Sequence, residues 1–283
     1  MRIEAHCAYT RIALMAFAGI CACATAGSPS AQGLAGIAHV AFRVTDVERS
    51  RSFYGSLGFV QAFEFADPGK PLVSYIKIND RQFIELYGRS DESQPIGLMH
   101  VCYEAANIEA VRREYVARGI VAPESRKARA GNLLFSINDP GGQMIEFTQY
   151  LPGSLHYNDR GKHGGERRIS DRLLRVIVPA NDAAVATNFY VEKLGFQEVG
   201  RESGACAAGH VLRLPGESGE ELGIDNATVV ANPRVAFAVS DVARTTKDLR
   251  NRGFRVNLNT RCASVMDPDG TLIEFMRVDR EER

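Results

Sequence analysis

Two residue types that bind metal ions recur in this sequence at one constant spacing. His39 and His100 lie 61 residues apart, and the same interval separates Glu85 from Glu146. Imidazole nitrogens and carboxylate oxygens suit a divalent first-row metal ion and leave positions for water or substrate. A lone histidine or glutamate in a strand is usually a hydrogen-bonded or solvent-facing residue, but two pairs at an equal offset favour a shared site. The sequence therefore predicts that all four side chains bind one divalent metal ion.

The spacing of these residues follows from an internal fourfold repeat. Each repeat opens with a short apolar strand, continues with a helix of about ten to fifteen residues and reaches a glycine followed by an apolar residue, as in Gly58-Phe59. Glycine at that place suits a left-handed helix C-cap, after which a new strand begins. Each unit is thus β-α-β-β-β, with helices expected at 47–57, 107–118, 183–194 and 242–252. The fold class is α+β, with four such modules paired into two domains.

The pairing of modules would bring the four residues together. If two modules pair about a pseudo-twofold axis, both histidines and both carboxylates meet near that axis. In a strand, alternate side chains point to opposite faces. We therefore expect the apolar neighbours of His39 and Glu85, such as Ala38, Val40 and Ile84, to lie under the helices. His39 and Glu85 themselves would face the concave side.

The chain divides into four segments by composition and repeat. Residues 1–33 resemble an export signal, because a positive start and a short apolar run precede the small-x-small site Ala24-Thr25-Ala26. Residues 34–150 form the first, metal-binding domain, 151–172 a Gly- and Arg-rich linker, and 173–279 the second domain. We therefore expect an exported protein, periplasmic or secreted, with no stable membrane insertion after cleavage. Lysine plus arginine and aspartate plus glutamate both number 34, so no basic excess is available to bind nucleic acid.

Three motifs resemble the vicinal oxygen chelate superfamily, which includes glyoxalase I, extradiol dioxygenases and bleomycin resistance proteins. They are Gly36-Ile37-Ala38-His39-Val40, Phe53-Tyr54-x-x-Leu57-Gly58-Phe59 and Asp139-Pro140-Gly141-Gly142-Gln143-Met144-Ile145-Glu146-Phe147. The resemblance implies paired β-α-β-β-β modules that curl into a cup. It also implies a metal ion (Zn, Ni, Fe, Mn or Co) that chelates adjacent oxygens of a small-molecule substrate. The chain could act as a monomer or a homodimer.

Within this resemblance, the order His39, Glu85, His100, Glu146 matches glyoxalase I-like members at all four positions. That match implies a lyase or isomerase in which a carboxylate moves a proton between adjacent carbons, with Glu146 as the first choice for the base and Glu85 as the second. One alternative is an extradiol-type Fe(II) dioxygenase that uses His39, His100 and Glu146, although Ser136 stands where that motif expects tyrosine. Another is a non-catalytic protein that binds a small molecule, as bleomycin resistance proteins do.

The second half has different residues at the corresponding places. Arg175 and Arg234 replace the two histidines, Gly223 falls near the place of Glu85, and Glu274 alone is kept. A guanidinium is always charged and cannot ligate a metal ion. We expect the two arginines to pair with Glu274, the alternative being an anion site for a substrate carboxylate or phosphate.

Three cysteines lie beyond the predicted export signal, at positions 102, 206 and 262. Cys102 falls in an apolar strand and is expected to be a buried small side chain. Cys206 and Cys262 are expected to be free thiols, although an oxidising compartment would allow a disulfide between them.

Overall fold

The structure is a computed structural model that describes residues 33–203, 206–227 and 233–278. The export signal predicted for residues 1–33 falls almost entirely outside these ranges, so it stays a prediction. Among the described residues, no helix is both long enough and apolar enough to cross a membrane.

The first sheet is made by the strands between Leu34 and Gln149 and has eight members in the order β2-β3-β4-β1-β5-β8-β7-β6. Its central pair, β1 and β5, is antiparallel, while β4 runs parallel to β1 and β8 runs parallel to β5. The two modules are therefore related by a pseudo-twofold axis between β1 and β5, as the repeat predicts. The strands are β1 (Leu34–Val44), β2 (Val60–Phe65), β3 (Val73–Lys77), β4 (Phe83–Gly88), β5 (Gly97–Ala105), β6 (Arg126–Lys127), β7 (Leu133–Asn138) and β8 (Met144–Gln149).

The second sheet repeats this topology in the order β10-β11-β12-β9-β13-β16-β15-β14. Its central antiparallel pair is β9 and β13, each flanked by a parallel strand from its own module. The strands are β9 (Leu173–Ala180), β10 (Gln197–Gly200), β11 (His210–Arg213), β12 (Glu221–Asn226), β13 (Arg234–Val239), β14 (Asn257–Leu258), β15 (Cys262–Met266) and β16 (Leu272–Arg277). The fold is thus the predicted α+β arrangement of four β-α-β-β-β modules.

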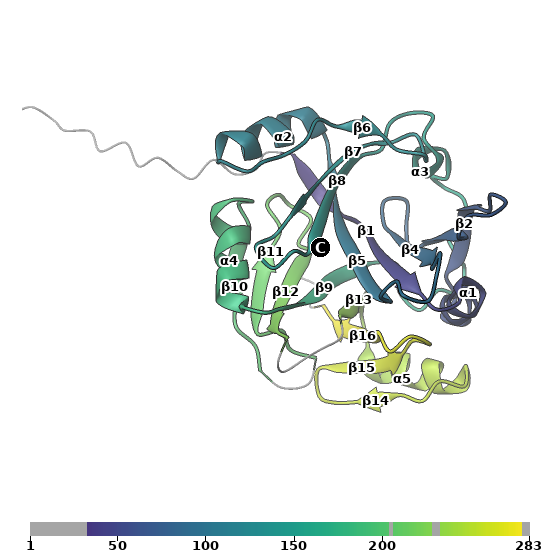
Figure 1. Ribbon diagram of the computed structural model, residues 1–283. Coiled ribbons are helices and arrows are strands. Elements are labelled where there is room, and N and C mark those ends of the chain that lie inside the picture. The colour runs from purple at the N-terminus through teal and green to yellow at the C-terminus, as the bar shows by residue number, and fades with distance from the viewer. Residues whose placement is uncertain (1–32, 204–205, 228–232, 279–283) are drawn as a thin grey trace, which may run out of the picture.

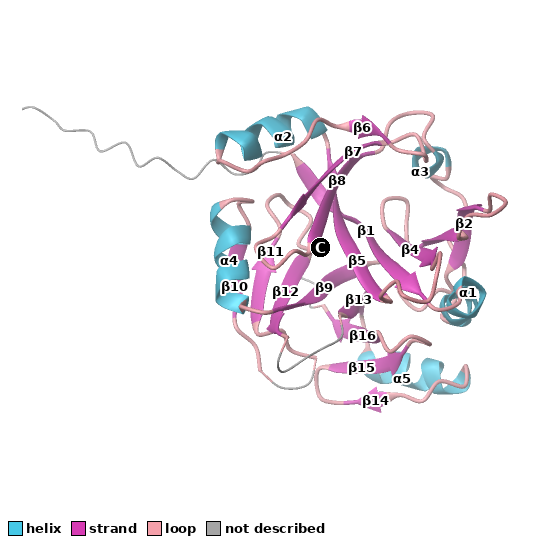
Figure 2. Cartoon of the chain, in the orientation of Figure 1, coloured by secondary structure: helices cyan, strands magenta, loops and turns pink. Residues whose placement is uncertain are grey.

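One long helix follows the first strand of each module and lies outside its sheet (Figures 1 and 2). These helices are α1 (Val47–Ser56), α2 (Ile108–Ala117), α4 (Ala183–Glu192) and α5 (Val242–Asn251). An aspartate or asparagine caps each N-terminus by accepting a backbone hydrogen bond through its side chain. Glycines with positive φ follow the C-terminal ends, such as Gly58 at +89° and Gly119 at +83°. The glycines in the sequence therefore predicted correctly where the helices end.

A single apolar core joins the two halves. The largest cluster of buried hydrophobic residues contains side chains from both sheets and from the helices that cover them. Aromatic rings make part of the contact between halves, with ring centroids 5.2 Å apart for Phe59 and Phe237 and 5.4 Å apart for Tyr103 and Phe196. The two sheets are consequently held together by packing as well as by the chain that connects them.

The segment 151–172, expected to be a linker, contains a packed element. Its short helix α3 (Leu155–Asn158) is capped by Ser154, and His156 within it is buried. Lys77 of β3 is also buried, and its Nζ donates hydrogen bonds to the carbonyl oxygens of Asp159 and Lys162. Part of the segment expected to be a linker is therefore packed, because a lysine of the first sheet binds it.

Candidate metal centre

Strand register places the four predicted site residues in two adjacent rows on one face of the first sheet. In one row, Ala41 of β1 lies between Glu85 of β4 and His100 of β5. In the other, Cys102 of β5 lies between His39 of β1 and Glu146 of β8. Residues in register on neighbouring strands present their side chains to the same face. The sheet therefore brings together the residues that the sequence spacing selected.

The prediction for the neighbours of His39 was half right. Val40 belongs to the main core, as do Ile84 and Leu86 on either side of Glu85. Ala38, however, packs in a separate small cluster with Phe83, Cys102 and Tyr150, while Ile37 lies in the main core. The register of β1 against β5 shifts between Ile37 and His39. Such an irregularity puts two consecutive residues on one face, so strict alternation fails here.

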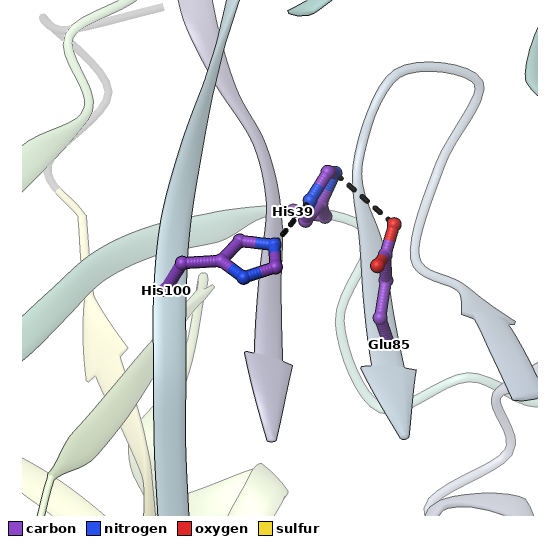
Figure 3. A group of neighbouring side chains, drawn as sticks. All are labelled: His39, Glu85 and His100. Carbon is purple, nitrogen blue, oxygen red and sulfur yellow. Dashed lines mark hydrogen bonds and ion pairs between the residues drawn. The ribbon is translucent and has the colours of Figure 1, made fainter. Parts of the chain in front are cut away.

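His39 is the centre of the cluster (Figure 3). Its Nε2 lies 3.0 Å from His100 Nε2 and 3.4 Å from Glu146 Oε1, and its Nδ1 lies 3.4 Å from Glu85 Oε1. Candidate ligand atoms of His39, Glu85 and His100 lie within 4.8 Å of one another, and so do those of His39, Cys102 and Glu146. The two groups share His39; one adds Glu85 and His100, and the other adds Cys102 and Glu146.

Burial sets the protonation of these groups. Desolvation lowers the pKa of His39 to about 3 and that of His100 to about 4, so both imidazoles are neutral near pH 7. Desolvation, together with repulsion from Glu146, raises the pKa of Glu85 to about 8. The Tyr87 hydroxyl donates a 2.7 Å hydrogen bond to Glu85 Oε2 and lowers that pKa in part. Desolvation likewise raises the pKa of Glu146. Two carboxyl groups thus lie together in a buried place with neutral imidazoles between them.

The donor set fits a divalent metal ion. Neutral imidazoles offer lone pairs, and two nitrogen ligands about 2.1 Å from one ion at a right angle to each other are about 3.0 Å apart. The two Nε2 atoms are separated by this distance. The other ring nitrogens, His39 Nδ1 and His100 Nδ1, are buried without a hydrogen-bond partner among the described residues. A divalent ion would also supply the positive charge that two buried carboxylates need when ionised.

Three further residues belong to this neighbourhood, and sequence reasoning did not assign them to it. Cys102 was expected to be only a buried small side chain, yet it stands two residues after His100 on the same face and in one candidate group. Its place could have been found from the two-residue period of a strand. Tyr87 contacts Glu85, and His156 Nε2 lies 4.0 Å from Glu85 Oε1. For His156 there was no local signal, because it comes from the segment interpreted as a linker.

The corresponding place in the second sheet holds ion pairs. Arg234 donates a 2.9 Å hydrogen bond to Glu274 Oε1 and also pairs with Asp225. Arg175 pairs with Glu221 and Glu202, at 2.6 and 2.8 Å, rather than with Glu274 as expected. A Cβ atom at Gly223, near the place of Glu85, would lie 2.7 Å from side-chain atoms of Ala208 and Ile177. Packing thus leaves no room there for a carboxylate, and in the described part of the chain both candidate metal-binding groups lie in the first sheet.

Cys206 and Cys262 form a disulfide, which corrects the expectation of two free thiols. Their Cα atoms are 6.3 Å apart, within the range that a disulfide spans. The bond joins the segment after β10 to the first residue of β15. Cys102 is free and buried.

Two cavities lined by described residues lie outside the candidate metal-binding cluster. One, of about 1250 Å³, lies between Gly164–Arg172 and residues of β13 and α5, and another, of about 630 Å³, lies beside Lys77 and Glu220. The cluster itself is nearly closed. Of its two carboxylates, Glu146 is 8% exposed and Glu85 3% exposed. A small molecule that reaches the cluster would therefore meet Glu146 more readily than Glu85.

Comparison with known proteins agrees with this fold and arrangement. A family model described as Glyoxalase/Bleomycin resistance protein/Dioxygenase superfamily matches residues 36–147 and again residues 172–275. The chain therefore belongs to this superfamily, and each half contains one copy of its characteristic domain. No curated protein sequence gave a significant match.

Solved structures with the same fold include a glyoxalase and several dioxygenases. The Mn(II)-bound glyoxalase from Novosphingobium aromaticivorans has a TM-score of 0.66 at 16% identity, covering 87% of this chain and 82% of that one. The 2,3-dioxygenase LapB from Pseudomonas sp. KL28 also has a TM-score of 0.66, at 15% identity, covering 87% and 93%. An extradiol ring-cleaving dioxygenase from B. fuscum has a TM-score of 0.62 at 17% identity, covering 87% and 72%. At such identities the likeness shows the fold alone.

Proposed function

We propose that this protein is a metal-dependent enzyme that resembles glyoxalase I and acts on a small molecule with adjacent oxygen atoms. The observation that carries the proposal is the convergence of His39, His100, Glu85 and Glu146 in one buried cluster centred on His39. His39 and His100 would hold the ion together with one or both carboxylates. A bound divalent ion would polarise a substrate carbonyl and make the adjacent C–H more acidic.

The carboxylates supply the proton transfer in this proposal. Burial raises the pKa of Glu85 to about 8 and also raises that of Glu146, which brings these groups toward the range where a general base is effective at neutral pH. Glu146 is the first choice for the base that contacts substrate, because it is the more exposed of the two. Glu85 is the second choice. The neutral imidazoles of His39 and His100 leave the carboxylates as the groups that gain and lose the proton.

A specific observation also favours a second candidate, an extradiol-type Fe(II) dioxygenase. His100 and Glu146 both approach His39 Nε2, whereas Glu85 lies beside Nδ1 on the other side of the ring. His39 Nε2 therefore lies in a site of two histidines and one carboxylate, a ligand set typical of non-haem iron oxygenases.

Two assays separate the candidates: conversion of the hemithioacetal of methylglyoxal and glutathione, and oxygen consumption on catechol with Fe(II). Tight binding of a small molecule without turnover in either assay would indicate a non-catalytic binding protein.

Metal content tests the shared part of both candidates. The purified protein, loaded with Mn²⁺ and freed of excess, should contain about one ion per chain, and His39→Ala and His100→Ala should each keep less than about half of that amount. His210→Ala is the matched control, because His210 lies on β11 and pairs with Glu198 in the second sheet. Full occupancy in both His39→Ala and His100→Ala would show that the ion, if bound, has other ligands.

A further inference from the structure

A third buried histidine lies beside the metal-binding cluster and makes no hydrogen bond. His156 of α3 is 2% exposed, and neither of its ring nitrogens has a hydrogen-bond partner in the described part of the chain. Leaving a buried polar group unsatisfied costs about 1–3 kcal/mol. An imidazole kept at such a position therefore needs an explanation beyond packing, since an apolar ring of similar shape would avoid that cost.

Aromatic side chains fix the position of the His156 ring. It stacks on Tyr150, with centroids 4.5 Å apart and planes 18° from parallel. Phe63, Tyr75 and Phe83 meet it edge-on, with centroids 5.0, 5.5 and 4.9 Å away. Backbone contacts secure the helix as well, because Leu155 N donates to Ala130 O. The ring is thus held by packing alone, and its nitrogens remain available.

Two acidic side chains lie near His156: Asp159, which acts on it electrostatically, and Glu85 of the cluster. His156 Nε2 lies 4.0 Å from Glu85 Oε1, which also lies 3.4 Å from His39 Nδ1, while Glu85 Oε2 accepts the hydrogen bond from Tyr87. A separation of 4.0 Å is too long for a hydrogen bond, but the other oxygen of the same carboxylate is already fixed. A hydrogen bond between these two atoms would require Oε1 to move closer to Nε2. The Glu85 carboxylate is thus flanked by two imidazoles and one phenol.

We propose that His156 is a positioning residue of the metal site, which donates a hydrogen bond through Nε2 to Glu85 Oε1 and so fixes this carboxylate beside His39. The inference rests on the proposed function only in requiring that the cluster binds a metal ion. Groups that orient metal ligands from outside the coordination sphere typically contribute about 10–100-fold to metal affinity. His156 would act in this way through Glu85, without touching the ion.

The test uses a variant that keeps the packing and removes the donor. His156→Phe retains an aromatic ring to stack on Tyr150, so the melting temperature of the metal-free protein should be unchanged or higher, because the unsatisfied nitrogens are gone. Its affinity for Mn²⁺, measured by titration calorimetry, should fall about 10–100-fold. His156→Gln, which retains an N–H donor, should recover part of that affinity. His163→Phe is the matched control, because His163 belongs to the same segment but pairs with Asp159.

The outcomes separate this inference from the metal site itself. A wild-type protein that binds Mn²⁺ and a His156→Phe variant with an affinity within about twofold of it would overturn the role of His156 and leave the site intact. Equal losses of stability and affinity in the Phe and Gln variants would also overturn it, since they would indicate a role in packing. If wild type binds no divalent ion, the proposed function fails and the inference fails with it. A stable His156→Phe variant with weakened binding, partly rescued in His156→Gln, supports the proposal.

Discussion

Replacing Arg234 by methionine should destabilise the protein strongly without affecting the candidate metal-binding cluster. Arg234 lies on β13 at the place that His100 occupies in the first sheet, and its guanidinium pairs with Glu274 and Asp225. It also donates to the carbonyl oxygen of Ala207. Glu274 is 0% exposed, so its carboxylate cannot turn to water when its partner is removed. Methionine fills much of the same volume but offers no hydrogen-bond donor.

The size of the effect follows from the charge that is left behind. Burial raises the pKa of Glu274 above its ordinary value of 4.5 even while Arg234 opposes the shift, so losing the arginine raises it further. The buried group can avoid its charge by taking up a proton, which at pH 7 costs about 3 kcal/mol for a carboxyl group with an ordinary pKa. Removing one partner of a buried ion pair typically costs about 3–5 kcal/mol. The melting temperature should consequently fall by about 6–15 °C.

The pH dependence of the stability lost in Arg234→Met tests this reasoning more directly than the melting temperature does. A carboxyl group whose folded pKa is raised above its unfolded pKa favours the folded state below the unfolded value and loses that advantage as pH rises. The stability gap between wild type and Arg234→Met, measured by urea denaturation, should therefore be small near pH 4.5 and grow toward pH 8. The double variant Arg234→Met/Glu274→Leu should regain much of the loss, and Mn²⁺ content should match wild type in both. A gap below about 1 kcal/mol at pH 7.5, or one independent of pH, would refute this reasoning. A stable Arg234→Met variant with weakened substrate binding would instead support the anion-site alternative.

Two further predictions concern the disulfide and the metal-binding cluster. Cys262→Ser should lower the free energy of unfolding by up to about 4 kcal/mol, because the Cys206–Cys262 bond closes a loop with a sequence separation of 56. Dithiothreitol should lower the melting temperature of the wild-type protein but leave that of the variant unchanged. The affinity for Mn²⁺ should rise by up to about tenfold per pH unit from pH 6 to about 8 and then level off, because burial raises the pKa of Glu85 to about 8 and a cation binds the charged form. A flat profile in calorimetric titrations over this range would exclude Glu85 from the charge that balances the ion.

The fold was predictable because the residues that mark the ends of its helices act locally. Glycines such as Gly58 and Gly119 adopt the positive φ that follows a helix end, as their places in the repeat indicate. Because these signals recur four times, errors in one module could be checked against the others. The position of Ala38 was predicted wrongly because it depends on a long-range contact. The irregularity in β1 arises from its pairing with β5, and the residues around Ala38 do not encode that pairing.

The candidate site was predictable to the extent that it obeys the repeat. The two pairs of residues, each with a spacing of 61, are brought together by strand register, which any two paired modules would share. His156 has no counterpart in this scheme, because it comes from the segment after β8, which is held against the first sheet by long-range contacts such as those of Lys77. The pairing of Cys206 with Cys262 likewise depends on the proximity of the segment after β10 to the start of β15, and sequence alone left a disulfide and free thiols both open.

The contrast between the two sheets is itself an argument for a metal ion in the first. Both sheets place carboxylates on the equivalent inner strands, and a buried carboxylate needs a compensating positive charge. In the second sheet Arg175 and Arg234 supply that charge, each within hydrogen-bond distance of an acidic side chain. In the first sheet the same two places hold His39 and His100, whose pKa values of about 3 and 4 make them neutral near pH 7. Near neutral pH the raised pKa values of Glu85 and Glu146 oppose their joint ionisation, and a cation from outside the chain would relieve that opposition, with the neutral imidazoles as suitable ligands for it.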